Sequence, residues 1–250
     1  MTTPEDKTRR PSAHALHEDH RLRMRRRVEK YGLDSLAEHE VLEYLLYYAI
    51  PRRDTNPVAH ALLTRFGSLA GVLSASAAEL QEVSGIGPSA AAYLCMLPQI
   101  ERCRVLSSTR KTERLDTPEK LAGVLAPQFR GEKQEKLALL ALDDRQRLLR
   151  LVWLESGTVG SVEISVKRIA AEAIAAGASC AVLAHNHPGG AAMPSRADLL
   201  STGEVMRALA VLDVCLTDHL IFAGEDWLSL RASGRMPVID AISGRIRYAE

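Results

Sequence analysis

Several classes of protein are excluded by what this sequence of 250 residues lacks. No apolar run approaches the length of a membrane span, and the N-terminus is polar, without the apolar stretch of a signal peptide. Scattered cysteines without a Cys-x-x-Cys spacing argue against a disulfide framework or a zinc ribbon, and favour a reducing compartment. We therefore expect a cytoplasmic protein without membrane contact. The four cysteines are Cys95, Cys103, Cys180 and Cys215.

The chain also lacks an excess of charge of either sign. Its 32 Lys and Arg residues nearly balance 31 Asp and Glu residues, and the formal net charge is +1. Bulk electrostatics therefore point to neither an acidic nor a basic partner. The length suffices for one large domain or two smaller ones, and nothing in the composition indicates the oligomeric state.

What the chain does contain is a histidine pair with the spacing of metal ligands. The apolar run Cys180–Ala184 predicts a buried strand, which Pro188 ends. Side chains two positions apart on a strand point to the same side, so His185 and His187 should project together from its end. Two neutral imidazoles and one carboxylate, with room for a water, make an open zinc site of the catalytic type.

A carboxylate follows at a suitable distance, in the first turn of the next predicted helix. Ser195 and Asp198 stand three positions apart at its start. This spacing is that of a capping box, which explains both residues without a metal. It does not explain two histidines at the mouth of an apolar strand, beside a Gly/Pro loop where α/β sheets tend to build sites. Asp198 can serve both roles.

The combined motif resembles that of a known family. His185-x-His187, seven residues, Ser195, two residues and Asp198 match the motif of JAMM (MPN+) metalloproteases, and the wider context resembles their bacterial RadC branch. The resemblance extends from about residue 21 to 234. It departs from that branch at Ser165-Val166-Lys167-Arg168 and at Gly189-Gly190, so substrate contacts are not carried over. The stretches that carry it also include Gly157-Thr158, Asp218-His219, Asp54-Thr55-Asn56-Pro57 and Arg65-Phe66-Gly67-Ser68-Leu69.

The resemblance implies a zinc peptidase site with His185, His187 and Asp198 as the three ligands of one Zn²⁺. It places a general-base glutamate at the start of the strand that opens the domain, a position that Glu135 occupies, directly before the apolar run 137–140. By resemblance, Ser195 would donate a hydrogen bond to the oxyanion.

Two further glutamates are alternative candidates for the general base, and a third histidine is a candidate for a supporting role. Glu163 is the second choice for the general base, since it precedes a predicted helix, and Glu132 is the third. His219 is expected to support the core or a ligand, not to bind the metal.

The N-terminal half is predicted to be helical. We expect a disordered tail at 1–20, a helical domain at 21–106 and a linker at 107–117. Gly85-Ile86-Gly87 separates helices at 79–83 and 88–97 and makes a helix-hairpin-helix unit. Its turn could offer N–H groups to DNA phosphates, but no Lys or Arg follows it. Two interpretations of this unit remain: it binds DNA, or it serves for packing within the helical domain or for docking of a protein.

The C-terminal half alternates predicted strands and helices. This order favours a mixed α/β sheet flanked by helices, which resembles the MPN fold, at 118–234, followed by a tail at 235–250. The expected helices are 118–129, 166–176 and 195–212. The expected strands are 137–142, 148–154, 180–184, 214–222 and 227–230.

Two classes of function follow. The first is a zinc metallopeptidase that hydrolyses a peptide or isopeptide bond of a peptide or protein substrate. The alternative is a DNA-binding accessory protein in repair or recombination, with a structural or vestigial zinc site. Pure scaffolding is a third interpretation.

Overall fold

The structure is a computed structural model that describes residues 13–51, 53–109, 113–154, 166–240 and 243–248, with only the backbone for 13–18. The chain divides into two compact units, Met1–Gln99 and Ile100–Glu250. Among the described residues, no helix combines the length and the apolar character needed to cross a membrane.

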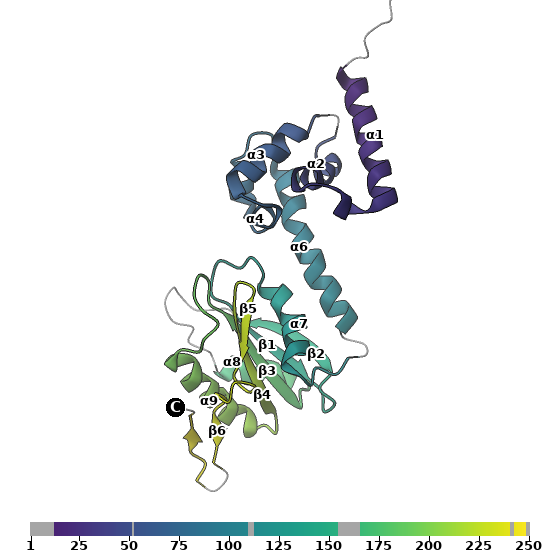
Figure 1. Cartoon of the computed structure of the whole chain (residues 1–250). Coiled ribbons are helices and arrows are strands. Elements are labelled where there is room, and N and C mark those ends of the chain that lie inside the picture. The colour runs from purple at the N-terminus through teal and green to yellow at the C-terminus, as the bar shows by residue number, and fades with distance from the viewer. Residues whose placement is uncertain (1–12, 52, 110–112, 155–165, 241–242, 249–250) are drawn as a thin grey trace, which may run out of the picture. The chain divides into compact units, whose positions relative to one another are not determined.

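The first unit is helical (Figure 1). Its apolar residues recur at helical spacing, and they meet in one core that includes Leu42, Leu46 and Leu62, all fully buried. Residues 13–20, expected in a disordered tail, belong to the first helix. The elements are α1 (Ala13–Tyr31), η1 (Leu33–Ser35), α2 (Glu38–Ala49), α3 (Asn56–Phe66), α4 (Leu69–Leu73), α5 (Ala77–Gln81) and α6 (Pro88–Thr109).

The helix-hairpin-helix region forms as α5, a turn and α6. Gly85 has a φ of +97°, and a Cβ there would lie 2.8 Å from Cγ2 of Val58. The turn therefore needs glycine for its backbone conformation and for its close packing on α3. The second helix was expected to end at Leu97, but α6 continues past Pro98 to Thr109. A proline removes one backbone hydrogen bond from a helix, and here this does not end it.

The segment 107–117, expected as the linker, is helical up to Thr109. At its other end Leu115 is buried at 2% exposure, and its N–H donates to the carbonyl of Gln146. Leu115 therefore belongs to the core of the second unit, where its apolar side chain is buried among other apolar side chains.

The second unit is a five-stranded mixed sheet with helices on both faces, as expected for the fold class (Figure 1). The strand order is β2-β1-β3-β4-β5, in which β3 and β4 are parallel and the other pairs antiparallel. The strands are β1 (Leu137–Leu142), β2 (Leu148–Leu154), β3 (Cys180–Asn186), β4 (Cys215–Ala223) and β5 (Asp226–Ser229), and the helices are α7 (Pro118–Phe129), α8 (Val166–Ala175) and α9 (Arg196–Ala210).

All six residues of β1 are buried because both faces of the sheet are covered. Ala138, Leu140 and Leu142 belong to the core that α7 closes. Leu137 and Leu139 belong to the core that α8 and α9 close. The unbroken apolar run of β1 thus follows from a two-sided core, and the neighbouring strand β3 carries His185 and leads into His187.

The C-terminal segment 235–250 is more ordered than the expected tail. β6 (Val238–Ile239) and β7 (Ile246–Arg247) form a two-stranded antiparallel sheet. A Cβ at Gly203 of α9 would lie 2.7 Å from Oη of Tyr248 and 3.1 Å from Ile246. The small sheet therefore packs closely on α9, because glycine leaves room for it.

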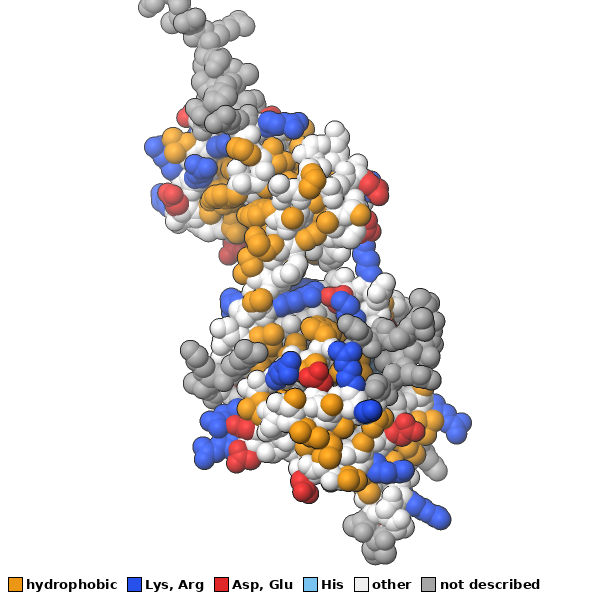
Figure 2. Space-filling model, turned by 180° about the vertical axis from the view of Figure 1, so that it is seen from behind, with side chains coloured by type: hydrophobic (Ala, Val, Ile, Leu, Met, Phe, Trp, Pro, Cys, Tyr) orange, Lys and Arg blue, Asp and Glu red, His pale blue; other side chains and the backbone are white. Residues whose placement is uncertain are grey.

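The surface of each unit mixes side chains of all types. On the face seen in Figure 2, hydrophobic side chains lie between basic and acidic ones. The mixture of side-chain types agrees with the small net charge of the chain, and it does not indicate one class of partner.

Candidate metal centre

The central strand β3 positions the two histidines at its C-terminal end. His185 lies opposite Leu137 of β1 and Ile221 of β4, so its backbone is held on both sides. The N–H of His187 donates to the carbonyl of Phe222, which extends the pairing one residue past the strand. Pro188 cannot donate such a bond, and the chain turns away there. The imidazole Nε2 atoms of the two histidines lie 2.8 Å apart.

Helix α9 positions the carboxylate through the expected capping box, which the structure confirms. The Ser195 hydroxyl accepts from the N–H of Asp198 at 3.1 Å, and the Ser195 N–H donates to Oδ2 of Asp198 at 2.7 Å. The hydroxyl of Ser195 also lies 2.7 Å from Oδ2 and donates to it. These bonds hold the Asp198 side chain against its own helix start, facing the imidazoles.

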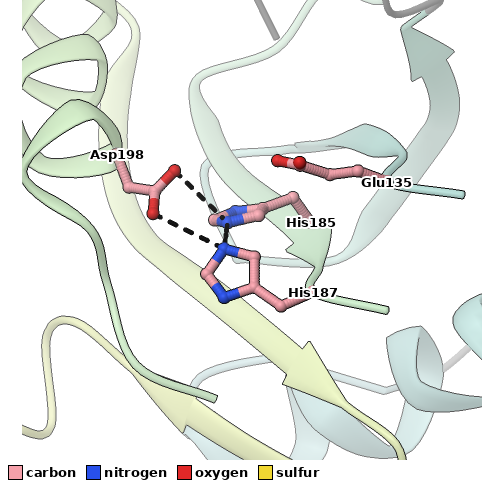
Figure 3. A group of neighbouring side chains, drawn as sticks. All are labelled: Glu135, His185, His187 and Asp198. Atoms are coloured by element: carbon pink, nitrogen blue, oxygen red, sulfur yellow. Dashed lines mark hydrogen bonds and ion pairs between the residues drawn. The ribbon is translucent and has the colours of Figure 1, made fainter. Parts of the chain in front are cut away.

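The four side chains form one group, the histidine–carboxylate cluster of Glu135, His185, His187 and Asp198 (Figure 3). One ligand atom from each residue lies within 4.8 Å of all the others. Oδ1 of Asp198 is 3.4 Å from Nε2 of His185, and Oδ2 is 3.5 Å from Nε2 of His187. The cluster could hold a metal ion, since two imidazole nitrogens and a carboxylate are the donor set that zinc accepts.

Burial in the cluster is uneven. The His185 side chain is 3% exposed, whereas those of His187 and Asp198 are 21% and 16% exposed. The side of the cluster formed by His187 and Asp198 is therefore the more exposed one. An open side is what a catalytic metal needs, because a closed structural site leaves no position for water.

The surroundings of Asp198 favour the ionised form of its carboxylate. Burial raises its pKa, but the hydrogen bond and the charge of His185, together with the bonds from Ser195, outweigh burial and hold the pKa well below its ordinary value. An ionised carboxylate is the form that binds a cation. The donor set therefore fits a divalent metal in charge as well as in geometry.

Glu135 comes from the segment just before β1, and a buried asparagine anchors that segment. Oδ1 of Asn186 accepts from the N–H of Lys136 at 2.8 Å, and its Nδ2 donates to the carbonyl of Gln134 at 3.0 Å. Asn186 lies between the two histidines in sequence, and it is 5% exposed. Its side chain thus ties the backbone on both sides of Glu135 to the strand that carries the histidines.

The other candidates from the sequence lie elsewhere. Glu132 forms ion pairs with Arg102 at 2.9 Å and Lys136 at 2.6 Å, outside the cluster. Glu163 lies outside the described residues. His219 of β4 lies behind the cluster, with its Nε2 2.8 Å from Nδ1 of His185.

Two residues near the cluster received no role from the sequence. Asn186 is one. The other is Thr202 of α9, whose hydroxyl lies 2.7 Å from Nδ1 of His219. A signal for Thr202 existed in its position one helical turn after Asp198, on the same face. Position on the helix does not predict that Thr202 and His219 are both fully buried, at 0% exposure.

A mixed sheet covered by helices on both faces, with the histidine–carboxylate cluster at the C-terminal end of its central strand, is the arrangement of a JAB-type domain. Comparison with known proteins agrees, since the family model described as the RadC-like JAB domain matches residues 115–235. The UPF0758 protein Mpe_A2695 of Methylibium petroleiphilum is 36% identical over 213 residues, which cover 85% of this chain and 96% of that protein. The chain therefore belongs to the RadC family of UPF0758 proteins, and the resemblance found in its motifs is confirmed.

Proposed function

We propose that this RadC-family chain is a zinc-dependent metallopeptidase that hydrolyses a peptide or isopeptide bond in a peptide or protein substrate. The observation that carries the proposal is the convergence of His185, His187 and Asp198 with a second carboxylate, Glu135, within 4.8 Å. Three ligands with an open side, and one free carboxylate beside them, make up the catalytic set that metal-assisted hydrolysis needs.

In this proposal His185, His187 and Asp198 hold one Zn²⁺. The ion supplies electrostatic activation: it lowers the pKa of water to about 7 and polarises a carbonyl. Asp198 brings negative charge, and Ser195 keeps that carboxylate turned to the imidazoles.

Glu135 acts as the general base and acid. Its exposed carboxylate takes a proton from the attacking water and passes that proton to the nitrogen of the leaving amine. The hydrogen bonds of Asn186 with Lys136 and Gln134 hold the backbone on both sides of Glu135.

Ser195 would stabilise the oxyanion that develops on the substrate carbonyl. Its hydroxyl donates to Oδ2 of Asp198 in the structure, so this role requires the hydroxyl to turn from the carboxylate to the substrate.

The first experiment measures zinc per chain by elemental analysis in the wild type and in Asp198→Ala, with circular dichroism to establish folding. We expect about one zinc in the wild type and strong loss in the variant. Absence of zinc from both folded proteins, with failed remetallation, would overturn the proposal. In that event, salt-dependent binding of branched DNA would support the accessory role instead.

The second experiment is a glutamine scan of the three glutamates, read out by hydrolysis of a fluorogenic peptide library. Glu135→Gln should retain zinc and lose hydrolysis by a factor of about 10² to 10⁴. Glu132→Gln is the matched control, because its carboxylate is engaged with Arg102 and Lys136. Glu163→Gln tests the other candidate base. Loss of hydrolysis in Glu163→Gln, with full activity in Glu135→Gln, would reverse the assignment.

A further inference from the structure

Behind the histidine–carboxylate cluster, a chain of buried hydrogen-bonding groups connects two of its residues, Asp198 and His185. It runs from the carbonyl oxygen of Asp198 to the hydroxyl of Thr202, to the imidazole of His219, and to Nδ1 of His185. Thr202 and His219 are fully buried, and His185 is 3% exposed. Water therefore has little access to these contacts, and the groups must satisfy one another.

The direction of every bond in this chain of groups follows from its fixed end. A backbone carbonyl can only accept, so the single hydroxyl hydrogen of Thr202 points to Asp198. The reverse arrangement would leave two oxygen lone pairs facing each other at hydrogen-bond distance. The Thr202 oxygen must then accept the hydrogen bond at its other contact, which comes from Nδ1–H of His219 at 2.7 Å.

A neutral imidazole carries one N–H, so Nε2 of His219 is left as an acceptor. A second proton on this ring would place an unpaired cation in a fully buried position, which is costly. The contact at 2.8 Å is therefore a hydrogen bond from Nδ1–H of His185 to Nε2 of His219. The Nε2 atom of His185 is then the ring nitrogen that points into the cluster and is available to a metal ion.

His187 reaches the same state by a shorter route. Its Nδ1 lies 3.1 Å from the carbonyl oxygen of Ala191, which can only accept. The two Nε2 atoms lie 2.8 Å apart, so a cation between them, whether a proton or a metal ion, relieves the repulsion of their lone pairs.

We propose that Thr202 and His219 are positioning residues that hold His185 in its metal-binding tautomer, with the proton on Nδ1. The inference rests on the proposed zinc site and deepens it. The chain of groups also links two ligands, because it starts at the backbone of Asp198 and ends at the ring of His185. Groups that orient a metal-bound histidine in this way affect metal affinity about 10- to 100-fold.

The first test needs no variant and no metal. Metal-free wild-type protein labelled with ¹⁵N-histidine is studied at about pH 8, above the ordinary histidine pKa of about 6.5. Long-range nitrogen–proton correlation spectra show which ring nitrogen carries the proton. The expected result is a proton on Nδ1 of His185, donated to Nε2 of His219. A His185 ring whose Nδ1 carries no proton would overturn the inference.

The second test compares two substitutions of one residue. Thr202→Val keeps the shape but has no hydroxyl, so His219 can shift its proton to Nε2 and drive His185 into the other tautomer. The zinc Kd, measured by competition with a chromophoric chelator, should rise about tenfold or more in Thr202→Val. Thr202→Ser retains the hydroxyl and should stay within about threefold of the wild type.

A purely structural role for Thr202 predicts a different pattern. Both variants would then lose stability, while the zinc Kd and the tautomer of His185 would equal those of the wild type, and this result would overturn the inference. Failure of the proposed function has its own outcome, which is the expected tautomer in a folded wild type that binds no zinc.

Discussion

Replacing Asn186 by alanine should separate the placement of Glu135 from the binding of the metal. The Asn186 side chain makes two hydrogen bonds, to the N–H of Lys136 and the carbonyl of Gln134, on either side of Glu135. The proposed ligand histidines are held by the β1, β3 and β4 backbones instead. Zinc content should therefore be unchanged, whereas Glu135, the proposed general base, loses its anchor.

The expected loss of stability follows from the two bonds. A hydrogen bond contributes about 0.5–1.5 kcal/mol net, so Asn186→Ala should cost about 1–3 kcal/mol. The value should fall in the lower half of that range, because Gln134 is exposed and water can replace one bond. Chemical denaturation of the metal-free protein measures this term directly.

The expected loss of activity is larger than the loss of stability suggests. A displacement of a catalytic group by about 1 Å can reduce the rate about 10²-fold. Asn186→Asp is the second variant: it keeps an acceptor for the N–H of Lys136, but it replaces the donor to Gln134 by a carboxylate oxygen and adds a charge at a buried position. It should be intermediate in hydrolysis. Wild-type stability and hydrolysis in Asn186→Ala would refute the reasoning that this amide positions Glu135.

Three further predictions concern stability. Burial, and next the charge of His185, lower the pKa of His219 in the folded protein, whereas the unfolded chain has the ordinary histidine pKa of about 6.5. Below about pH 6.5 the unfolded chain therefore binds more protons, and the free energy of unfolding should fall with decreasing pH by up to about 1.4 kcal/mol per unit. In denaturation from pH 8 to 5, His219→Gln should show a smaller pH dependence than the wild type. Leu139→Ala empties a fully buried position and should cost about 2–5 kcal/mol in urea denaturation. Gly85→Ala places a methyl group against Val58 at a positive φ and should lower the free energy of unfolding by about 1–3 kcal/mol, whereas Gly87→Ala, with open space around it, should change it little.

The controls for these predictions use differences between variants. Asp218 contacts the N–H of His219, and its own pKa is raised by burial, which gives an opposite slope at acid pH. That contribution cancels when the wild type is compared with His219→Gln. Equal slopes in the two proteins would contradict a neutral, buried His219. Equal stabilities of the two glycine variants would contradict the close packing of the turn on α3.

Much of the fold could be predicted because its signals are local. The apolar runs gave β1 and β2 with the bounds that the structure has, since both strands are marked by flanking polar residues. The capping box located the start of α9 at Ser195. Long-range packing explains the failures: α6 continues past Pro98, and the β6–β7 sheet has strands too short to show an alternating pattern.

The candidate ligands could also be predicted, because a period of two along a strand places His185 and His187 on one side whatever surrounds them. The general base could not be assigned in this way. Glu135 lies beside His185 because β1 pairs with β3 antiparallel, with Leu137 opposite His185, and the register of two strands is not written in either one alone.

The sequence by itself determined the donor types, their spacing and the elements that carry them, because those depend on neighbours along the chain. Only the tertiary structure placed the carboxylate of Glu135 beside the histidines and showed which buried groups lie behind them. Thr202, His219 and His185 come from three elements, and they meet only when α9, β4 and β3 pack together. Hydrogen bonds between buried side chains depend on distances of a few ångströms, which sequence separation does not encode.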